Sequence, residues 1–195
     1  MYFHKNIRLS PLNYVGSQSY FVTFCCFNRR PIFSDASLCT WLLETLRAES
    51  AARSFAIHAY CVMPDHLHFL AEGLTPASDL ANLAKTLKLK TSRAYQKNTP
   101  QPLWQKKYFD HILRPHEQVE RVAWYIWMNP IRKGLSQNVG EYLFAGSFTH
   151  LVSQMKSPST LWTPPWKTRA PASEGGRYNP QNPHDATPRN SSTME

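Results

Sequence analysis

The order of apolar and polar positions along the chain predicts a series of strands and helices before any chemistry is considered. Residues 20–27 (YFVTFCCF) form a short aromatic and β-branched run, which is typical of a buried strand. Apolar residues then recur every three or four positions over residues 36–52, the spacing of a helix with one buried face. Residues 55–63 and 66–73 are two further apolar runs, and the Pro-Asp pair at 64–65 between them predicts a tight turn and a hairpin.

The second half of the chain continues this alternation. A helix is predicted over residues 78–97, a strand over 104–113, and a third helix after Pro115 that runs to Asn129. This helix should stop or bend at its end, because Pro130 disfavours helical conformation in the residue before it. The order β-α-β-β-α-β-α predicts an α+β fold of the ferredoxin-like, split βαβ type. Such a fold has an antiparallel sheet with helices on one face, and the third helix is a C-terminal addition to it.

The composition of the chain changes near residue 157. Seven of the fifteen prolines lie between Pro158 and Pro188, among Ser, Asn, Thr, Gly and Arg residues. Such a segment buries too little apolar surface to offset the entropy lost on ordering its backbone. We therefore expect one domain of ordinary size over residues 1–156 and a disordered tail over residues 157–195.

The charge of the chain bears on its partners. A formal net charge of +9 at pH 7 fits a polyanion, nucleic acid above all, although an ordinary soluble protein can also be basic. The N-terminal residues lack the apolar core of a signal peptide, and no stretch is long enough to cross a membrane. The four cysteines show no C-x-x-C spacing, which favours reduced thiols. We therefore expect a cytoplasmic protein with no membrane partner.

Two histidines stand out in the third predicted strand, where residues 62–70 read VMPDHLHFL. Residues two apart point to the same face of a strand, so the imidazoles of His66 and His68 can bind the same ligand. That ligand could be a metal ion or a phosphate. The pair could also bind nothing, since an isolated histidine pair is more often structural than functional.

The third predicted helix carries Tyr125 and Asn129, which are four residues apart and therefore lie on one face of it. Tyr125 lies at the edge of the apolar stripe that Val122 and Ile126 belong to. A tyrosine in this position is most often a boundary residue whose hydroxyl reaches water. Its position alone therefore assigns it no chemistry.

Three motifs in this order resemble the HUH single-strand DNA transposases with one catalytic tyrosine. They are HLH at residues 66–68, WQKKYFDHILR at residues 104–114 and YIWMNPIRKGL at residues 125–135. The resemblance is strongest to the REP-associated tyrosine transposases and covers roughly residues 17–150. An isolated H-x-H is a weak signal, whereas three motifs in matching order and spacing are specific.

The resemblance implies roles for individual residues. His66 and His68 would bind a divalent cation, Mg²⁺ or Mn²⁺, at the scissile phosphate, and Asn129 would supply the third ligand. Imidazole and amide ligands suit Mn²⁺ better than Mg²⁺. Tyr125 would attack the phosphate to give a 5′-phosphotyrosine link and a free 3′-hydroxyl. Reversal of this step would join strands without ATP, which is strand transfer rather than hydrolysis.

Basic residues are concentrated in the second predicted helix and the strand after it. Residues 80–109 contain seven Lys or Arg and no acidic residue, with Trp104, Tyr108 and Phe109 at their end. Basic residues neutralise phosphates and aromatic rings stack on bases, a combination that suits unpaired DNA. The alternative is a solvated basic helix face. We predict that DNA is bound by Lys85, Lys88, Arg93, Lys106, Lys107, Arg132 and Lys133.

Two functions are compatible with these features. The first is a single-strand endonuclease and strand transferase, a transposase that acts at hairpin-forming repeats. The second is a protein that binds such hairpins without cutting them, in regulation or genome maintenance. A histidine-triad hydrolase is disfavoured because Leu70 stands where the third histidine would be. Either favoured function predicts single-stranded DNA with hairpin repeats as the partner, bound by a monomer or a homodimer.

Overall fold

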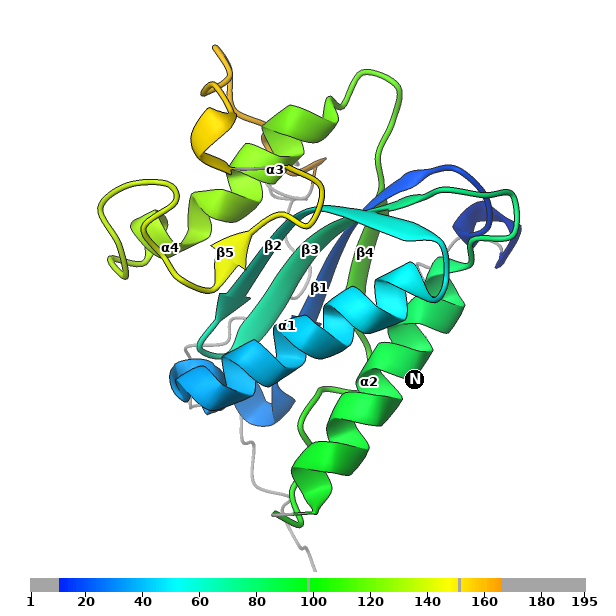
Figure 1. Ribbon diagram of the computed structural model, residues 1–195, viewed down its shortest axis with the longest axis vertical. Helices are drawn as coiled ribbons and strands as arrows, with labels where there is room; N and C mark the ends of the chain where they lie inside the picture. The colour runs from blue at the N-terminus through cyan, green and yellow to red at the C-terminus, as the bar shows by residue number, and fades with distance from the viewer. Residues whose placement is uncertain (1–10, 98, 151, 166–195) are drawn as a thin grey trace, which may run out of the picture. The chain divides into compact units, whose positions relative to one another are not determined.

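A five-stranded antiparallel sheet forms the centre of the protein in the computed structural model, which describes residues 11–97, 99–150 and 152–165. The strands are β1 (Ser19–Cys25), β2 (Phe55–Met63), β3 (His66–Gly73), β4 (Phe109–Ile112) and β5 (Ala145–Gly146). They lie in the order β4-β1-β3-β2-β5, and each neighbouring pair is antiparallel (Figure 1). This sheet and its helices match the α+β class predicted from the sequence.

Helices cover both faces of the sheet. The helix α1 (Ala36–Ala51) lies beside α2 (Leu80–Gln96) on one face, and α3 (Val119–Trp127) packs on the other (Figure 1). The short helix α4 (Asn129–Arg132) follows α3. Four short 3-10 turns complete the described structure: Pro11–Tyr14, Phe27–Arg29, Ile32–Ser34 and Val152–Gln154. The tyrosine-bearing helix is therefore separated by the sheet from the other two long helices.

Alternation along the strands divides the interior into two cores. In β1, Val22 and Phe24 belong to the core under α1 and α2, whereas Phe21 belongs to the core under α3. In β3, Leu67 and Phe69 face α1 and α2. Because successive side chains of a strand point to opposite faces, the intervening residues of β3 face α3. Both histidines are among these residues.

The starts and ends of the helices follow local sequence signals. The Asp35 carboxylate accepts a hydrogen bond from Ser37 N at 2.8 Å and caps α1, and Asp79 caps α2 in the same way. The third helix begins at Val119, not directly after Pro115, and has no side-chain cap. Its predicted end is confirmed, because α3 stops at residue 127 and α4 begins two residues later.

Three strands differ from the sequence prediction. β1 ends at Cys25 and not at residue 27, because Phe27 begins a 3-10 turn. β4 comprises only Phe109–Ile112 instead of 104–113, because the chain before it packs into the hydrophobic core. Trp104 is 5% exposed, and its Nε1 donates a hydrogen bond to Thr91 Oγ1 at 2.8 Å. β5 is not predicted at all, since a strand of two residues leaves no alternation to detect.

The packed part of the chain extends beyond residue 156, where the sequence predicts the domain to end. Trp162 is 7% exposed and belongs to the core under α3, and the compact unit of the chain reaches this residue. Residues 166–195, most of the predicted disordered tail, lie outside the described residues.

Candidate active site

The two histidines of β3 lie side by side on the face of the sheet that α3 covers. The pairing of β3 with β1 places His68 opposite Thr23 and His66 opposite Cys25. The imidazole rings meet edge to face with centroids 4.5 Å apart, and their Nε2 atoms are 3.0 Å apart. The two imidazoles therefore converge on one point, as strand alternation requires.

Each histidine is held through its other ring nitrogen. Nδ1 of His66 lies 2.5 Å from Oδ1 of Asp65, and Nδ1 of His68 lies 2.7 Å from Oγ1 of Thr23. An ionised carboxylate can only accept, so His66 donates from Nδ1, and in its neutral form it presents a lone pair at Nε2. The Thr23 hydroxyl can donate or accept, so His68 can present either a proton or a lone pair. The two Nε2 atoms can therefore share a proton or, as two lone pairs, a cation.

The charges around the pair favour a neutral His68. Burial lowers the pKa of His68 well below its usual range, and positive charge on His66, Arg132 and Arg29 lowers it further. The hydrogen bond from His66 lowers the pKa of the Asp65 carboxyl, and Arg29 adds to this effect. Neutral imidazole is the form in which histidine binds metal ions, so the lowered pKa of His68 favours that role.

Tyr125 reaches the same face of the sheet from α3. The centroid of its ring lies 6.0 Å from that of Phe21 and 5.1 Å from that of Trp162. The Phe21 ring in turn lies 5.4 Å from the His68 ring. Phe21 is therefore in contact with both the predicted nucleophile and the histidine pair.

The side chains that follow Tyr125 fold back on its helix. Nδ2 of Asn129 donates to the carbonyl oxygens of Tyr125 and Ile126 at 3.1 and 3.0 Å. Nη2 of Arg132 donates to the Tyr125 carbonyl at 2.6 Å, and its guanidinium carbon lies 4.4 Å from the centroid of the Tyr125 ring. Arg132 is therefore attached to the predicted nucleophile, and Lys133 is exposed at the end of α4.

The residues available to a metal ion are few. In the described ranges, no three His, Cys, Asp or Glu side chains are grouped so that they could hold a metal ion. The histidine pair offers two such donors on this face. Oδ1 of Asn129 is the remaining donor atom of that side chain, since Nδ2 bonds to the helix end. Two imidazoles and an amide oxygen would leave positions for water and phosphate oxygens.

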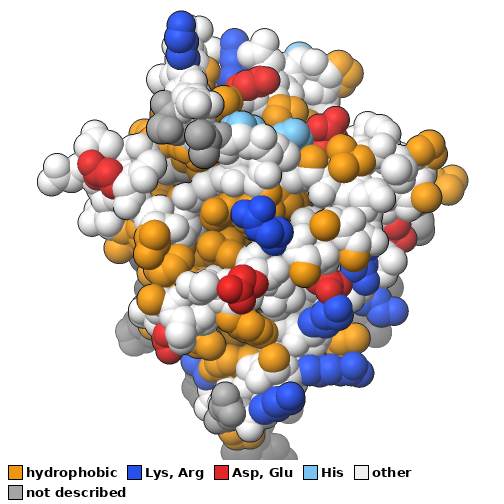
Figure 2. Space-filling model, in the orientation of Figure 1, with side chains coloured by type: hydrophobic (Ala, Val, Ile, Leu, Met, Phe, Trp, Pro, Cys, Tyr) orange, Lys and Arg blue, Asp and Glu red, His pale blue; other side chains and the backbone are white. Residues whose placement is uncertain are grey.

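Three of the five predicted DNA-binding residues of the second helix and the following segment line an open groove. Its volume is about 630 Å³, and it lies between α2 and the chain that precedes β4. Figure 2 shows Lys and Arg side chains gathered over α2. The groove is lined by Lys85, Lys88 and Lys106 with Trp104 and Tyr108, while Arg93 and Lys107 are exposed.

Lys88, like Arg132, is a predicted DNA-binding residue that is engaged within the protein. Its ammonium group donates to the carbonyl oxygens of Gln105 and Lys106 at 2.6 and 2.9 Å. The same group lies 5.7 Å from the centroid of the Phe24 ring and 5.8 Å from that of Tyr108. Lys88 therefore attaches α2 to the segment before β4, whatever it also does for DNA.

The sequence did not point to four side chains that shape the site. Thr23 and Phe21 could be found only from the register of β1 against β3, which a single sequence does not contain. Asp65 belongs to the predicted turn, although its place beside His66 is a usable signal. Trp162 lies at the start of the predicted tail.

Glu117 connects Trp162 to the elements around Tyr125. Nε1 of Trp162 donates to Oε1 of Glu117 at 2.8 Å. The second oxygen, Oε2, accepts from Arg114 N at 2.8 Å and lies 2.8 Å from Nε2 of His111 on β4. The C-terminal part of the compact unit is therefore held over the Tyr125 ring by a set of directed hydrogen bonds.

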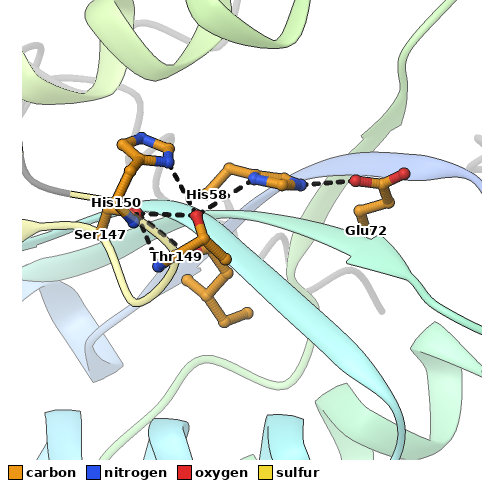
Figure 3. Close-up of polar contacts among 6 residues, drawn as sticks. His58, Glu72, Ser147, Thr149 and His150 are labelled. Atoms are coloured by element: carbon orange, nitrogen blue, oxygen red, sulfur yellow. Dashed lines mark hydrogen bonds and ion pairs between the residues drawn. The ribbon is translucent and has the colours of Figure 1, made fainter. Parts of the chain in front are cut away.

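A second histidine group lies farther along β2 and β3 (Figure 3). Nε2 of His58 lies 2.6 Å from Oε2 of Glu72, and Nδ1 lies 3.3 Å from Oγ1 of Thr149. The same Thr149 oxygen lies 2.9 Å from Nδ1 of His150. Burial lowers the pKa of His150, and the charge of His58 adds to this effect. This group attaches the segment after β5 to the sheet.

A family model described as Transposase IS200 like matches residues 14–129, which is more than half of the chain. The matched range includes the histidine pair of β3 and ends at Asn129, four residues after Tyr125. The chain therefore belongs to the IS200-like transposase family.

Individual relatives narrow this class. The chain is 24% identical over 136 residues to the REP-associated tyrosine transposase of Escherichia coli (strain K12), covering 68% of this chain and 78% of that protein. It is 26% identical over 160 residues to an uncharacterized protein of Haemophilus influenzae, covering 65% and 88%. A solved structure of a REP-associated tyrosine transposase bound to a REP hairpin matches the fold with a TM-score of 0.61 and 21% identity, over 72% of this chain and 81% of that one. The resemblance inferred from the three motifs is confirmed.

Proposed function

We propose that this protein is a metal-dependent endonuclease and strand transferase for single-stranded DNA, which cuts at or near hairpin-forming repeats through a 5′-phosphotyrosine intermediate. Its membership of the IS200-like transposase family supports this class of reaction. The observation that carries the proposal is the convergence of the paired Nε2 atoms and the Tyr125 ring on one sheet face, with Phe21 in contact with His68 and Tyr125.

A divalent cation, Mg²⁺ or Mn²⁺, would be held by Nε2 of His66, Nε2 of His68 and Oδ1 of Asn129. The two Nε2 atoms suit such an ion because Asp65 and Thr23 already engage both Nδ1 atoms, which directs the Nε2 atoms at each other. When bound, the cation would polarise the oxygens of the scissile phosphate and fix it for in-line attack. The two imidazole donors favour Mn²⁺ over Mg²⁺.

Tyr125 would supply the nucleophile. Its phenolic oxygen would form a bond to phosphorus and lose its proton to solvent, while the bond from phosphorus to the 3′ oxygen breaks. That oxygen would take up a proton and leave as a free 3′-hydroxyl. Arg132 would hold the tyrosine and neutralise charge on the phosphate. Attack of a 3′-hydroxyl on the phosphotyrosine would reverse the step and join two strands.

The substrate would be single-stranded DNA beside a hairpin. One relative of known structure is bound to a REP hairpin, and the charged groove beside α2 would suit the backbone of such DNA here. In the described part of the chain, no helix is long and apolar enough to cross a membrane. A cytoplasmic location, where DNA is available, is part of the proposal.

A protein that binds hairpins without cutting them is the second candidate. The observation that favours it is the packing of Trp162 on Tyr125, with ring centroids 5.1 Å apart, because a tyrosine ring held in this contact is less free to bring its hydroxyl to a phosphate. The two candidates share the DNA-binding surface and differ in whether Tyr125 reaches a phosphate.

The test is a cleavage assay on a labelled single strand that carries an imperfect hairpin, with Mn²⁺ or Mg²⁺ added. The wild type is expected to form a covalent protein–DNA band, and Tyr125→Phe is expected to bind the strand equally well and form none. Tyr95→Phe, a tyrosine of α2, is the matched control and should keep the band.

Two other outcomes would contradict the proposal. If the wild type binds the hairpin and forms no covalent band with either ion, the binding-only function is correct. If Tyr125→Phe still cuts the strand, the nucleophile is water or another tyrosine.

A further inference from the structure

The segment that follows β1 has an unusual backbone. Two neighbouring residues, Asn28 and Arg29, have φ values of 53° and 55°, which place both in the left-handed region. Asparagine tolerates this conformation, whereas arginine adopts it rarely because of its Cβ atom. Surrounding contacts must therefore hold Arg29 in place. Arg29 N donates to the Cys26 carbonyl at 3.0 Å, and Cys26 N donates to the Asp65 carbonyl at 2.9 Å, which fastens the segment to the turn before His66.

This backbone places the Arg29 side chain beside the histidine pair. Nη1 of Arg29 lies 3.2 Å from Oδ2 of Asp65, and the other oxygen of the same carboxylate lies 2.5 Å from Nδ1 of His66. The Arg29 side chain is nevertheless 57% exposed. A guanidinium has five N–H donors, so one contact with Asp65 leaves donors for a further anion. Arg29 therefore approaches the pair from the Asp65 side, while Arg132 lies over the ring of Tyr125.

Arg29 also stands where the basic groove meets the histidine pair. Lys88, which lines the groove, donates to the Gln105 carbonyl at 2.6 Å. Gln105 N in turn donates to the Cys25 carbonyl at 2.9 Å, and Cys25 pairs with His66 in the sheet. The end of the groove and the end of β1 are therefore joined, and Arg29 is four residues beyond that point in the chain.

The next residue, Arg30, has a structural role, because its guanidinium is bonded within its own chain. Its Nε donates to the Phe27 carbonyl at 3.4 Å, its Nη2 donates to the Pro102 carbonyl at 2.8 Å, and its Nη1 contacts Gln101. These bonds commit the Arg30 guanidinium to backbone and amide oxygens of its own chain. The two neighbouring arginines therefore differ in what they leave available to a ligand.

We propose that Arg29 contacts a backbone phosphate of the DNA strand, at the point where the strand passes from the basic groove to the histidine pair. The inference rests on the proposed function and adds a residue that the three sequence motifs do not contain. The two carboxylate oxygens of Asp65 would then orient two side chains, one holding His66 and the other holding Arg29. The fork of N–H donors suits a phosphate in the way that a lysine ammonium group does not.

The salt dependence of DNA binding tests this role. Each phosphate contact with single-stranded DNA contributes about 0.7 to the slope of log K against log salt concentration. We would measure hairpin-strand binding without divalent cations, which prevents cleavage and simplifies the slope. Arg29→Gly keeps the left-handed backbone accessible and should lower the slope by about 0.7, with roughly tenfold weaker binding. Arg29→Gln, which retains a side chain, should show the same loss.

Arg30→Gln is the matched control, since it removes the same charge from the next residue. It should lower the thermal unfolding temperature through its lost backbone contacts and leave the slope unchanged. Arg29→Gly should change the slope and keep the unfolding temperature. If Arg29→Gly leaves the slope at the wild-type value, or if both arginine variants lower it equally, Arg29 is not a phosphate contact.

Failure of the proposed function would appear in the wild type itself. A wild-type protein without salt-dependent hairpin binding and without a covalent band would overturn that function and this inference together. A wild type that binds and cuts, combined with an unchanged slope for Arg29→Gly, would overturn this inference alone.

Discussion

Asp65 and Glu72 make the same contact in two different places. Each puts a carboxylate oxygen against a histidine nitrogen, at 2.5 Å for His66 and 2.6 Å for His58. Only the first histidine has a second imidazole nitrogen facing its free side, at Nε2 of His68. A carboxylate that accepts from Nδ1 raises the basicity of a metal-binding imidazole, so Asp65 should matter for metal affinity and Glu72 should not.

Asp65→Asn is therefore expected to weaken Mn²⁺ binding by roughly tenfold or more. The amide can still accept from Nδ1 of His66 but lacks the negative charge that strengthens the imidazole as a ligand. Calorimetric titration of the protein with Mn²⁺ measures the effect. Glu72→Gln is the matched control and should bind Mn²⁺ as the wild type does. Equal losses in the two variants would mean that the effect is global and does not pass through His66.

At the residue scale, the sequence predicts the relative positions of side chains when they belong to the same strand or helix. His66 and His68 could be placed on one face because both belong to a single strand with a fixed two-residue period. Tyr125 could be placed at the edge of a helix stripe for the same reason. Thr23 lies on a different strand, so its bond to His68 depends on a register that alternation within one strand does not specify.

At the scale of elements, the junction between α2 and the chain before β4 depends on one lysine. Lys88 bonds to two carbonyl oxygens there, whereas Lys85 lies one helical turn earlier and is exposed. The two lysines line the same groove and carry the same charge. Because only Lys88 bonds to backbone carbonyl oxygens, the two lysines should differ in their contribution to stability.

Lys88→Met is expected to lower the free energy of unfolding by about 1–2 kcal/mol, because its loss leaves carbonyl oxygens without a charged donor. Lys85→Met should change it by less than about 0.5 kcal/mol. Denaturant unfolding measures both values. Equal stabilities of the two variants would contradict the structural role of Lys88.

Long elements with a complete pattern were predictable from the sequence, and short ones were not. The hairpin of β2 and β3 spans the predicted residues, because a Pro-Asp turn separates two full apolar runs. The predicted fourth strand was too long, since aromatic residues such as Trp104 have the same composition whether they extend a sheet or fill a core. Helix α3 began later than predicted because a proline permits a helix start without requiring one.

At the scale of the whole molecule, the order of elements gave the class of fold but not the sides of the sheet. A helix that follows the last long strand can return over either face, and the stripe of Val122 and Ile126 fits both. Here it covers the face that carries His66 and His68, which is what brings Tyr125 to them. The site therefore depends on which face of the sheet α3 covers, and no local sequence pattern determines that face.

The whole fold should also lose stability in mild acid. Burial lowers the pKa of His68 and of His150 in the folded protein, whereas both titrate near 6.5 in the unfolded chain. The unfolded state then binds more protons, so stability is full above about pH 6.5 and decreases as the pH falls below it.

Thermal unfolding of the metal-free protein over about pH 8 to pH 5 measures this loss. The unfolding temperature should stay constant down to about pH 6.5 and then decline. His150→Gln should decline less, because one of the two histidines no longer takes up a proton on unfolding. A wild-type unfolding temperature that rises on acidification would contradict the direction of both pKa shifts.

The edge of the sheet beside β2 is closed by the chain itself. β5 pairs with the middle of β2, Val62 N donates to the Phe144 carbonyl at 2.9 Å, and Phe148 N donates to the Ile57 carbonyl at 3.0 Å. Open strand edges invite strands of other molecules to add to a sheet and aggregate. A second copy of the protein therefore finds no free ladder along this part of β2. Of the two edge strands formed by the described residues, β4 is the longer, with four residues against two in β5, so two copies that share a continuous sheet should join there.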